Sequence, residues 1–162
     1  MSIFRNKIWI LFGLWVLLLM GCGRGIIYTR YIKIDNFVWN FNKKIEFKVN
    51  IKETDKKYEV LLHIRNASQY PYSNIWINVS GVDPNGKNIF TRKYEFTLAD
   101  ESGRWLGKGL GDIIDNQFII VEDFSAEKTG TYSFIVNHEM RVDNVPGIMD
   151  IGLTVREKKN KD

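Results

Sequence analysis

The sequence predicts an all-β protein with a single antiparallel β-sandwich, immunoglobulin-like or jelly-roll-like in outline, over residues 31–156. Three observations predict this fold. Short runs of residues alternate between apolar and polar with a period of two, which is typical of half-buried strands. Turn-forming residues separate these runs. No long segment with the 3.6-residue period of a helix follows residue 21.

An apolar leader opens the chain and precedes this domain. Arg5 and Lys7 come before thirteen residues, 8–20, that are apolar apart from one glycine. As a helix this run would rise about 20 Å, which is short of the roughly 30 Å hydrocarbon core of a bilayer. The length suits a secretory signal peptide. We therefore expect residues 1–21 to be a cleaved signal peptide, with an uncut N-terminal membrane anchor as the alternative.

Cys22 follows the leader directly and is the single cysteine of the chain. The sequence Leu19-Met20-Gly21-Cys22 resembles the bacterial lipobox, in which the cysteine is lipidated on sulfur and becomes the new N-terminus. A thiolate is a good nucleophile for accepting a lipid, and an intrachain disulfide is excluded because Cys22 has no partner. This pattern predicts a cleaved lipoprotein signal peptide. It also predicts attachment to a lipid bilayer through acyl chains on Cys22.

We expect residues 22–30 to form the lipidated N-terminus and a tether. The predicted strands follow this tether along the chain. Residues 31–37 form a weak leading strand. Residues 45–51 and 58–64 each alternate strictly, and the polar KETDKK sequence between them predicts a hairpin. Their apolar positions would face the core: Ile45, Phe47, Val49, Ile51, Tyr58, Val60, Leu62 and Ile64.

Two further strands, residues 74–82 and 88–98, are joined by the DPNGK sequence, in which Pro84 and Gly86 favour a tight turn. The apolar residues of this pair that we expect to face the core are Ile75, Ile77, Val79, Phe90, Tyr94, Phe96 and Leu98.

The second half of the domain continues with three strands. Residues 117–124 are a continuous apolar run that predicts a strand buried on both faces. Residues 130–140 and 148–155 alternate again, the latter with Met149, Ile151, Leu153 and Val155 together. A charged tail at 157–162 completes the chain, and a single helical turn is predicted at residues 111–116 or 125–129.

The charge balance argues against a nucleic-acid partner. Cleavage would remove Arg5 and Lys7, which leaves 21 of the 23 basic residues against 19 acidic ones. Such a nearly neutral domain lacks the basic excess that nucleic-acid binding requires. The one basic cluster, residues 156–162, is interpreted as a solvated terminus.

Residues that could support catalysis are scattered. His63 and His138 each fall inside a strand, without a second histidine at metal-binding spacing. We expect His138 to be a hydrogen-bonded histidine at the edge of the core. Glu122 and Asp123 are adjacent in a strand, so their side chains would point to opposite faces. No enzyme activity, metal or other cofactor is predicted.

A glycine-rich stretch, RWLGKGLGD, contains Trp105, Gly107, Gly109, Gly111 and Asp112. Its G-x-G-x-G spacing matches neither the dinucleotide fingerprint nor the phosphate-binding loop. The preferred interpretation is structural, with glycine permitting positive φ, a bulge or a close backbone approach. A mobile loop that presents Trp105, Lys108 and Asp112 to a partner is the functional alternative.

Aromatic residues form a second candidate site. Tyr70 and Tyr72 lie between strands, and Trp76 points opposite to Ile75 and Ile77. Exposed aromatic rings bind sugars or anchor protein interfaces. The alternative is that Trp76 packs inward against a loop.

Several stretches of the chain resemble the gliding-motility lipoprotein H (GldH) family. They are the lipobox, YPYSNIWI at 70–77, WLGKGLGDIIDNQ at 105–117, and the segment at 127–157 from EKTGTYSF through GIMDIG to LTVRE. The resemblance implies a cell-envelope lipoprotein that supports gliding and binds other envelope proteins.

No acidic residue follows closely after Cys22. This implies an outer-membrane attachment that faces the periplasm. The alternative function is a carbohydrate- or peptidoglycan-binding module anchored in the envelope.

Overall fold

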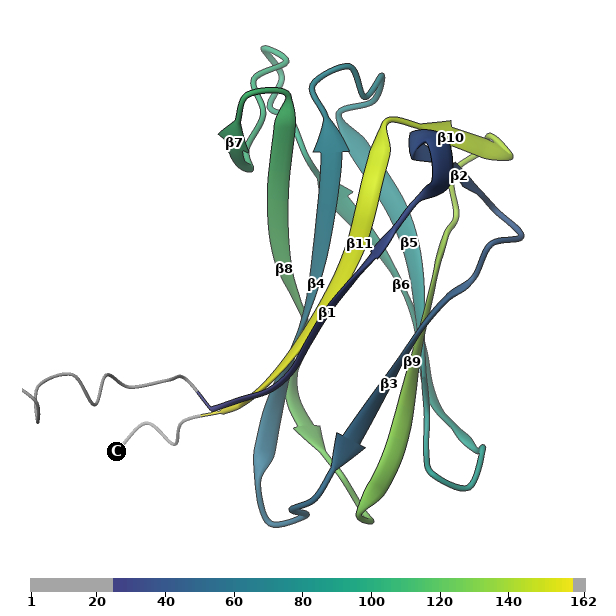
Figure 1. The fold of residues 1–162 in the computed structure, drawn as a ribbon, viewed down its shortest axis with the longest axis vertical. Helices are drawn as coiled ribbons and strands as arrows, with labels where there is room; N and C mark the ends of the chain where they lie inside the picture. The colour runs from purple at the N-terminus through teal and green to yellow at the C-terminus, as the bar shows by residue number, and fades with distance from the viewer. Residues whose placement is uncertain (1–24, 159–162) are drawn as a thin grey trace, which may run out of the picture.

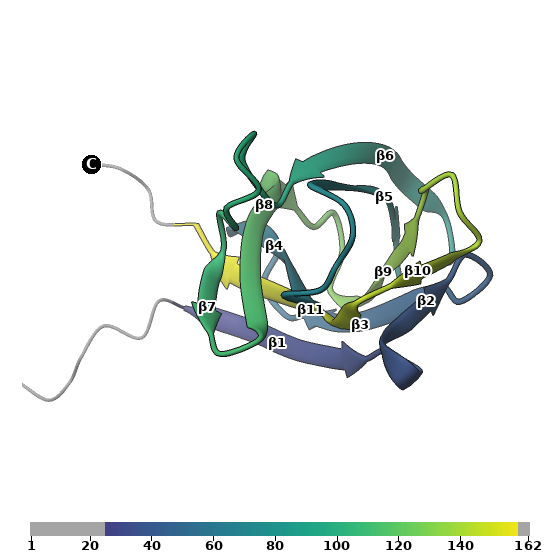
Figure 2. The ribbon, with the colours of Figure 1, turned by 90° about the horizontal axis from the view of Figure 1, so that it is seen from above.

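The computed structural model describes residues 25–158, so the predicted signal peptide, Cys22 and residues 159–162 lie outside the described part. Two antiparallel sheets face one another across a shared core (Figures 1 and 2). The predicted all-β sandwich is therefore confirmed. None of the helical segments within residues 25–158 has the length and apolar character needed to cross a membrane.

One layer is a five-stranded sheet with the spatial order β1-β11-β4-β8-β7. Its strands are β1 (Ile26–Lys33), β4 (Lys57–Ala67), β7 (Lys108–Leu110), β8 (Ile113–Ser125) and β11 (Ile148–Glu157). The long central strand β4 pairs with β11 on one side and with β8 on the other. The chain thus brings its first and last strands together at one edge.

The second layer is a four-stranded sheet with the order β3-β9-β5-β6. Its strands are β3 (Ile45–Ile51), β5 (Asn74–Val82), β6 (Asn88–Thr97) and β9 (Gly130–His138). A two-stranded ribbon of β2 (Val38–Asn40) and β10 (Asn144–Pro146) lies beside it, next to a 3₁₀ turn, η1 (Asp35–Phe37).

The core lies between the inward faces of the two sheets and contains rings from both. Phe118 of β8 stacks on Phe96 of β6 with ring centroids 4.2 Å apart. Phe124 contacts Phe134 of β9 at 5.5 Å. Such aromatic pairs add to the free energy gained by burying apolar area. They join strands of opposite sheets.

The period-two prediction identified most of this core. The predicted inward residues of β3, β5 and the first part of β4 are all buried. The hairpin of β5 and β6 is also confirmed. In its turn the Asp83 side chain accepts hydrogen bonds from the amides of Asn85 and Lys87, and Gly86 has a φ of 83°.

The predicted hairpin between residues 45–51 and 58–64 is wrong. Strand β3 pairs with β9, whereas β4 pairs with β11 and β8, so the two strands belong to different sheets. The polar connection between them crosses from one layer of the sandwich to the other. Alternation alone cannot distinguish this crossing from a hairpin, because both give each strand one buried face.

The N-terminal strand begins earlier than predicted. Residues 26–30, assigned to a tether, already pair with β11, and the strand ends at Lys33 rather than at residue 37. As an edge strand β1 is only partly covered, which explains its weak alternation. A 3₁₀ turn replaces the predicted strand end at Asp35–Phe37, whereas residues 111–116 and 125–129 contain no helical turn.

Strand β8 is longer than predicted and is not buried on both faces. Ile120 is buried, but its neighbour Ile119 is 46% exposed on the outer face of the sheet. Strand β7 covers only the first residues of β8. In β11 a bulge near Ile148 turns that residue inward in place of Met149, which is only half-buried.

Candidate binding surface at the aromatic end

The predicted aromatic residues gather at one end of the sandwich, here called the aromatic end. This end contains the connections at residues 68–73, 98–107 and 139–147, and it lies uppermost in Figure 1. Tyr70 links the predicted sites, because its ring centroid is 5.5 Å from that of Tyr72 and 6.4 Å from that of Trp105. The fold therefore unites two regions that the sequence presents separately.

Tyr70 is a structural residue of this end, since its side chain is only 4% exposed. Its hydroxyl donates a hydrogen bond to the carbonyl of Asn74 at 3.0 Å. Burial raises the pKa of the Tyr70 hydroxyl far above its usual value. Gly147, with a φ of 82°, lets the backbone approach Tyr70, because a Cβ there would lie 3.0 Å from the Tyr70 Cα. Tyr70 thus supports the surface from beneath.

Trp105 is half-buried and held by a compact loop. The Asp100 carboxylate accepts hydrogen bonds from the amides of Ser102 and Arg104 and from the Arg104 guanidinium. A hydrogen bond from the Ser102 hydroxyl at 2.7 Å, together with these bonds, lowers the pKa of the Asp100 carboxyl. A backbone bridge then joins Ala99 to Trp105, which packs against the core cluster. This loop fixes the position of the ring.

Beside these residues is a groove of about 330 Å³, here called the aromatic groove. Trp76 and Tyr72 line it together with Asn74, Met140, Arg141 and Val142. The Trp76 amide donates to the Met140 sulfur at 3.3 Å, and the Lys93 ammonium lies 5.0 Å from the centroid of the Trp76 ring. Trp76 lies on the face of β5 opposite to the buried Ile75 and Ile77, and it is half-buried beside the loop that carries Met140.

The segment from Met140 to Val142 also belongs to this groove, which the sequence pattern does not predict. It follows β9 and returns toward the ribbon of β2 and β10. Val142 is exposed there beside the half-buried Trp76. Only the pairing of β5 with β9 brings this segment to Trp76, and the sequence pattern does not reveal that pairing.

The glycine-rich stretch has clear geometric roles. A Cβ on Gly107 would lie 2.5 Å from the Asn116 side-chain oxygen and 2.7 Å from the Asp115 carbonyl. Gly111 has a φ of 62° in the turn from β7 to β8. Next to it, the Asp112 carbonyl accepts a hydrogen bond from the Ser68 amide at 2.9 Å. Close approach and positive φ, both predicted for these glycines, occur here. A partner-binding role of this loop stays a prediction.

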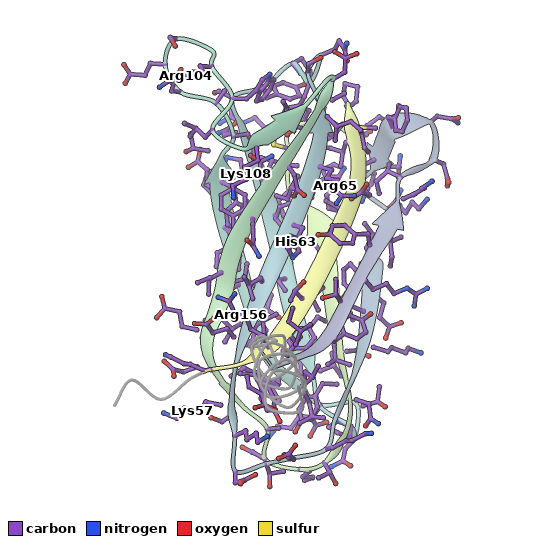
Figure 3. The ribbon with its side chains drawn as sticks, turned by 60° about the vertical axis from the view of Figure 1, so that its left-hand side comes forward. Lys57, His63, Arg65, Arg104, Lys108 and Arg156 are labelled. Atoms are coloured by element: carbon purple, nitrogen blue, oxygen red, sulfur yellow. The ribbon has the colours of Figure 1, made fainter. Side chains whose placement is uncertain are left out.

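A second cleft, of about 460 Å³, is lined by Tyr31, His63 and Asp115 on the outer face of the five-stranded sheet, and also by Leu106 and Phe118. The sequence pattern does not predict this cleft. His63 of β4 lines the cleft, and its Nε2 lies 2.9 Å from the Thr154 hydroxyl. Figure 3 shows His63, Arg65 and Lys108 on this face of the sheet. Burial lowers the pKa of His63. The imidazole is therefore neutral near pH 7.

Arg65 organises the charges next to this cleft. Its Nε lies 3.4 Å from the Asp115 carboxylate, and its Nη1 lies 3.7 Å from the Asp150 carboxylate. Its guanidinium carbon is 4.3 Å from the centroid of the Tyr31 ring. Asp150 is more buried than its partners, and this burial raises the pKa of its carboxyl. One guanidinium thus lies beside two carboxylates and the Tyr31 ring.

The two histidines do not come together, because β4 and β9 belong to different sheets. His138 is buried as predicted, with its ring centroid 5.3 Å from that of Trp39. Within residues 25–158 neither ring nitrogen makes a hydrogen bond of good geometry, although backbone groups of Trp39 and Asp143 lie close to the ring. In the same part of the chain, no group of three His, Cys, Asp or Glu residues could hold a metal ion.

The fold defines the class of protein, a single-domain antiparallel β-sandwich. The family model described as GldH lipoprotein matches residues 26–155, and the chain belongs to that family. The resemblance to the GldH family is thus confirmed over the domain, whereas the lipobox precedes the matched residues and stays a prediction. The family is one of lipoproteins associated with gliding motility.

Two relatives match over nearly their whole length. The gliding motility lipoprotein GldH homolog of Christiangramia forsetii is 24% identical, covering 90% of this chain and 92% of the relative. The gliding motility lipoprotein GldH of Flavobacterium johnsoniae is also 24% identical, covering 88% and 91%. Among solved structures, the insecticidal delta-endotoxin Cry8Ea1 of Bacillus thuringiensis superposes with a TM-score of 0.41 at 14% identity, over 74% of this chain and 19% of the toxin.

Proposed function

We propose that this GldH-family protein is a non-enzymatic accessory lipoprotein of the cell envelope that binds other envelope proteins through its aromatic groove. The observation that carries the proposal is the outward-facing pair Tyr72 and Trp76, which lines a groove with Arg141 and the exposed Val142. Trp, Tyr and Arg are the residues most often responsible for the binding energy of protein interfaces. The rigid loops beneath the groove reduce the entropy lost on binding.

The contacts of the polar side chains near His63 and Arg65 support the non-enzymatic part of the proposal. The Thr154 hydroxyl next to His63 is buried and also bonds to Thr29, so it is a poor nucleophile for a substrate in solvent. Asp115 and Asp150 both lie beside Arg65. Each of these carboxylates is thus engaged with the Arg65 guanidinium rather than free to meet a substrate.

The predicted signal peptide and the residues after Cys22 support a location for the protein in the cell envelope. We infer that acyl chains on Cys22 hold the domain on the outer membrane, facing the periplasm, because residues 23–26 are free of acidic side chains. Protease added to intact cells should leave the domain uncut, whereas permeabilised cells should lose it. Removal of the domain from intact cells would contradict the periplasmic orientation.

Crosslinking in living cells tests the binding proposal. The unchanged protein should capture one or more envelope proteins, and Trp76→Ala should reduce that capture strongly. Ile119→Ala is the matched control, because Ile119 is exposed on the outer face of the other sheet. Equal capture by the unchanged protein and both variants would contradict a role for the groove. Failure to capture any protein would contradict the accessory function itself.

A second candidate function is carbohydrate or peptidoglycan binding. The observation in its favour is that polar groups of Asn74 and Arg141 surround the Trp76 ring, an arrangement that suits a sugar. Calorimetric titration of the domain with cell-wall saccharides distinguishes the two. Specific binding at about millimolar affinity or tighter, lost in Trp76→Ala, would favour this second function.

A further inference from the structure

We propose that the end of the five-stranded sheet where β1 begins contacts the bilayer surface, so that the aromatic end points away from the membrane. This anchor end consists of Ile26, Ile27, Lys57 and the last residues of β11, Glu157 with Lys158. The inference rests on the proposed lipid on Cys22, and it adds a defined membrane-facing surface and an orientation to that proposal.

The number of residues between Cys22 and the start of β1 limits how far the sheet can lie from the membrane. Only three residues, Gly23 to Gly25, separate Cys22 from Ile26. Four residue steps span at most about 14 Å even when fully extended. The headgroup layer of one leaflet is roughly 5–7 Å thick. The first residues of β1 therefore stay near that layer.

The start of β1 has the composition expected of a membrane-facing surface. Ile26 is 57% exposed and Ile27 is 38% exposed, both at the outer edge of the sheet. Exposed apolar side chains at a headgroup boundary gain from leaving water. Further along the strand, the exposed positions are polar, at Thr29, Arg30 and Lys33. The apolar exposure is therefore concentrated at the end nearest the lipid.

The start of β1 is fixed firmly to the rest of the domain. The Glu157 amide donates to the Gly25 carbonyl at 2.8 Å, and the Lys158 amide donates to the Lys57 carbonyl at 2.8 Å. The Lys56 ammonium lies 2.8 Å from the Glu157 carboxylate. Because these bonds connect the strand to β11 and β4, the position of the lipid constrains the whole domain.

Strand β4 sets the distance between the two ends. It runs from Lys57 at the anchor end to Ala67, whose amide bonds to Gly147 at the aromatic end. Eleven residues of strand cover about 35 Å. Figure 3 shows the two ends on one face, with Lys57 at one and Arg104 at the other. A domain held at β1 thus presents its aromatic groove well beyond the headgroups.

Photo-crosslinking to lipid tests this orientation. The full chain is expressed in a bacterium that processes lipoproteins, purified and reconstituted into phosphatidylcholine vesicles. The photoreactive residue p-benzoylphenylalanine replaces either Ile26 or Leu106. Leu106 is the matched control, because it is 55% exposed but lies at the aromatic end. Mass spectrometry measures the acyl chains on Cys22 and the yield of crosslinked phospholipid.

We expect the probe at position 26 to crosslink phospholipid and the probe at position 106 to do so about tenfold less, because 35 Å exceeds the headgroup layer. A linker of about twelve Gly and Ser residues after Arg24, with a reach of about 20 Å, should reduce the yield at position 26 several-fold.

Equal yields at the two positions, or none at position 26, on a protein that carries its acyl chains would overturn the orientation alone. A protein with no lipid on Cys22 would overturn the proposed anchor on which the orientation depends.

Discussion

The ring of Tyr31 occupies the space beside Gly152 that a side chain would need, since a Cβ on Gly152 would lie 2.6 Å from two carbons of that ring. The His63 Cβ closes the same space at 3.1 Å. We expect Gly152→Ala to lower the free energy of unfolding by about 1–3 kcal/mol through overpacking. Urea denaturation measures the change. Gly109→Ala is the control, because its nearest neighbour is the mobile end of Ile114 at 3.2 Å. Equal losses in the two variants would contradict this explanation.

Phe134 connects the two sheets through its contact with Phe124 of β8, and it also packs against Phe90 of its own sheet. It is fully buried, so Phe134→Ala should cost about 3–5 kcal/mol of stability by leaving a cavity. Thermal and urea denaturation both measure this loss. Phe41→Ala removes an exposed ring of the same size and should change stability by less than about 0.5 kcal/mol. A normal melting temperature in Phe134→Ala would show that the strand faces are assigned wrongly.

The buried histidines predict a loss of stability in acid. Burial lowers the pKa of both His63 and His138 below the ordinary value of 6.5. The unfolded chain therefore binds more protons than the folded chain as the pH falls below about 6.5, and stability decreases with it. Urea denaturation at about pH 7.5 and pH 5.5 should reveal the fall. His138→Phe, which cannot be protonated, should show a smaller fall, and an unchanged fall would rule out His138 as a contributor.

The domain should fold without its lipid. Cys22 lies outside the β-sandwich, whose strands begin at Ile26. We expect Cys22→Ala to abolish lipidation and membrane attachment while the far-ultraviolet circular dichroism and melting temperature stay those of the unchanged domain. Cell fractionation and circular dichroism measure the two effects. A variant that is released from the membrane but unfolded would contradict the independence of fold and lipid.

The sequence predicts the central strands well because each has one fully buried face. Residues 74–82 have the predicted bounds of β5, and their alternation is visible without knowledge of their neighbours. Edge strands are harder to predict, because their partial burial weakens the alternation of apolar and polar residues. Residues 26–30 were therefore assigned to a tether, and the apolar run containing Ile119 was assigned a second buried face that it lacks.

The candidate site could be predicted only in part. The sequence identified Trp76, Tyr72 and Trp105 as individual candidates, but their shared location depends on strand pairings far apart in the chain. Arg141 and Val142 reach the groove only because β9 pairs with β5. The second cleft likewise needs β1, β4 and β8 to lie in one sheet, since it combines Tyr31 with His63 and Asp115.

Intact-mass and peptide mass spectrometry of the mature protein from membranes tests the central claim most directly. The account predicts an N-terminus at Cys22 whose mass is increased by covalently bound acyl chains. A mature chain that begins elsewhere, or one in which the Cys22 sulfur is unmodified and the protein is recovered in the soluble fraction, would contradict the lipid-anchored function.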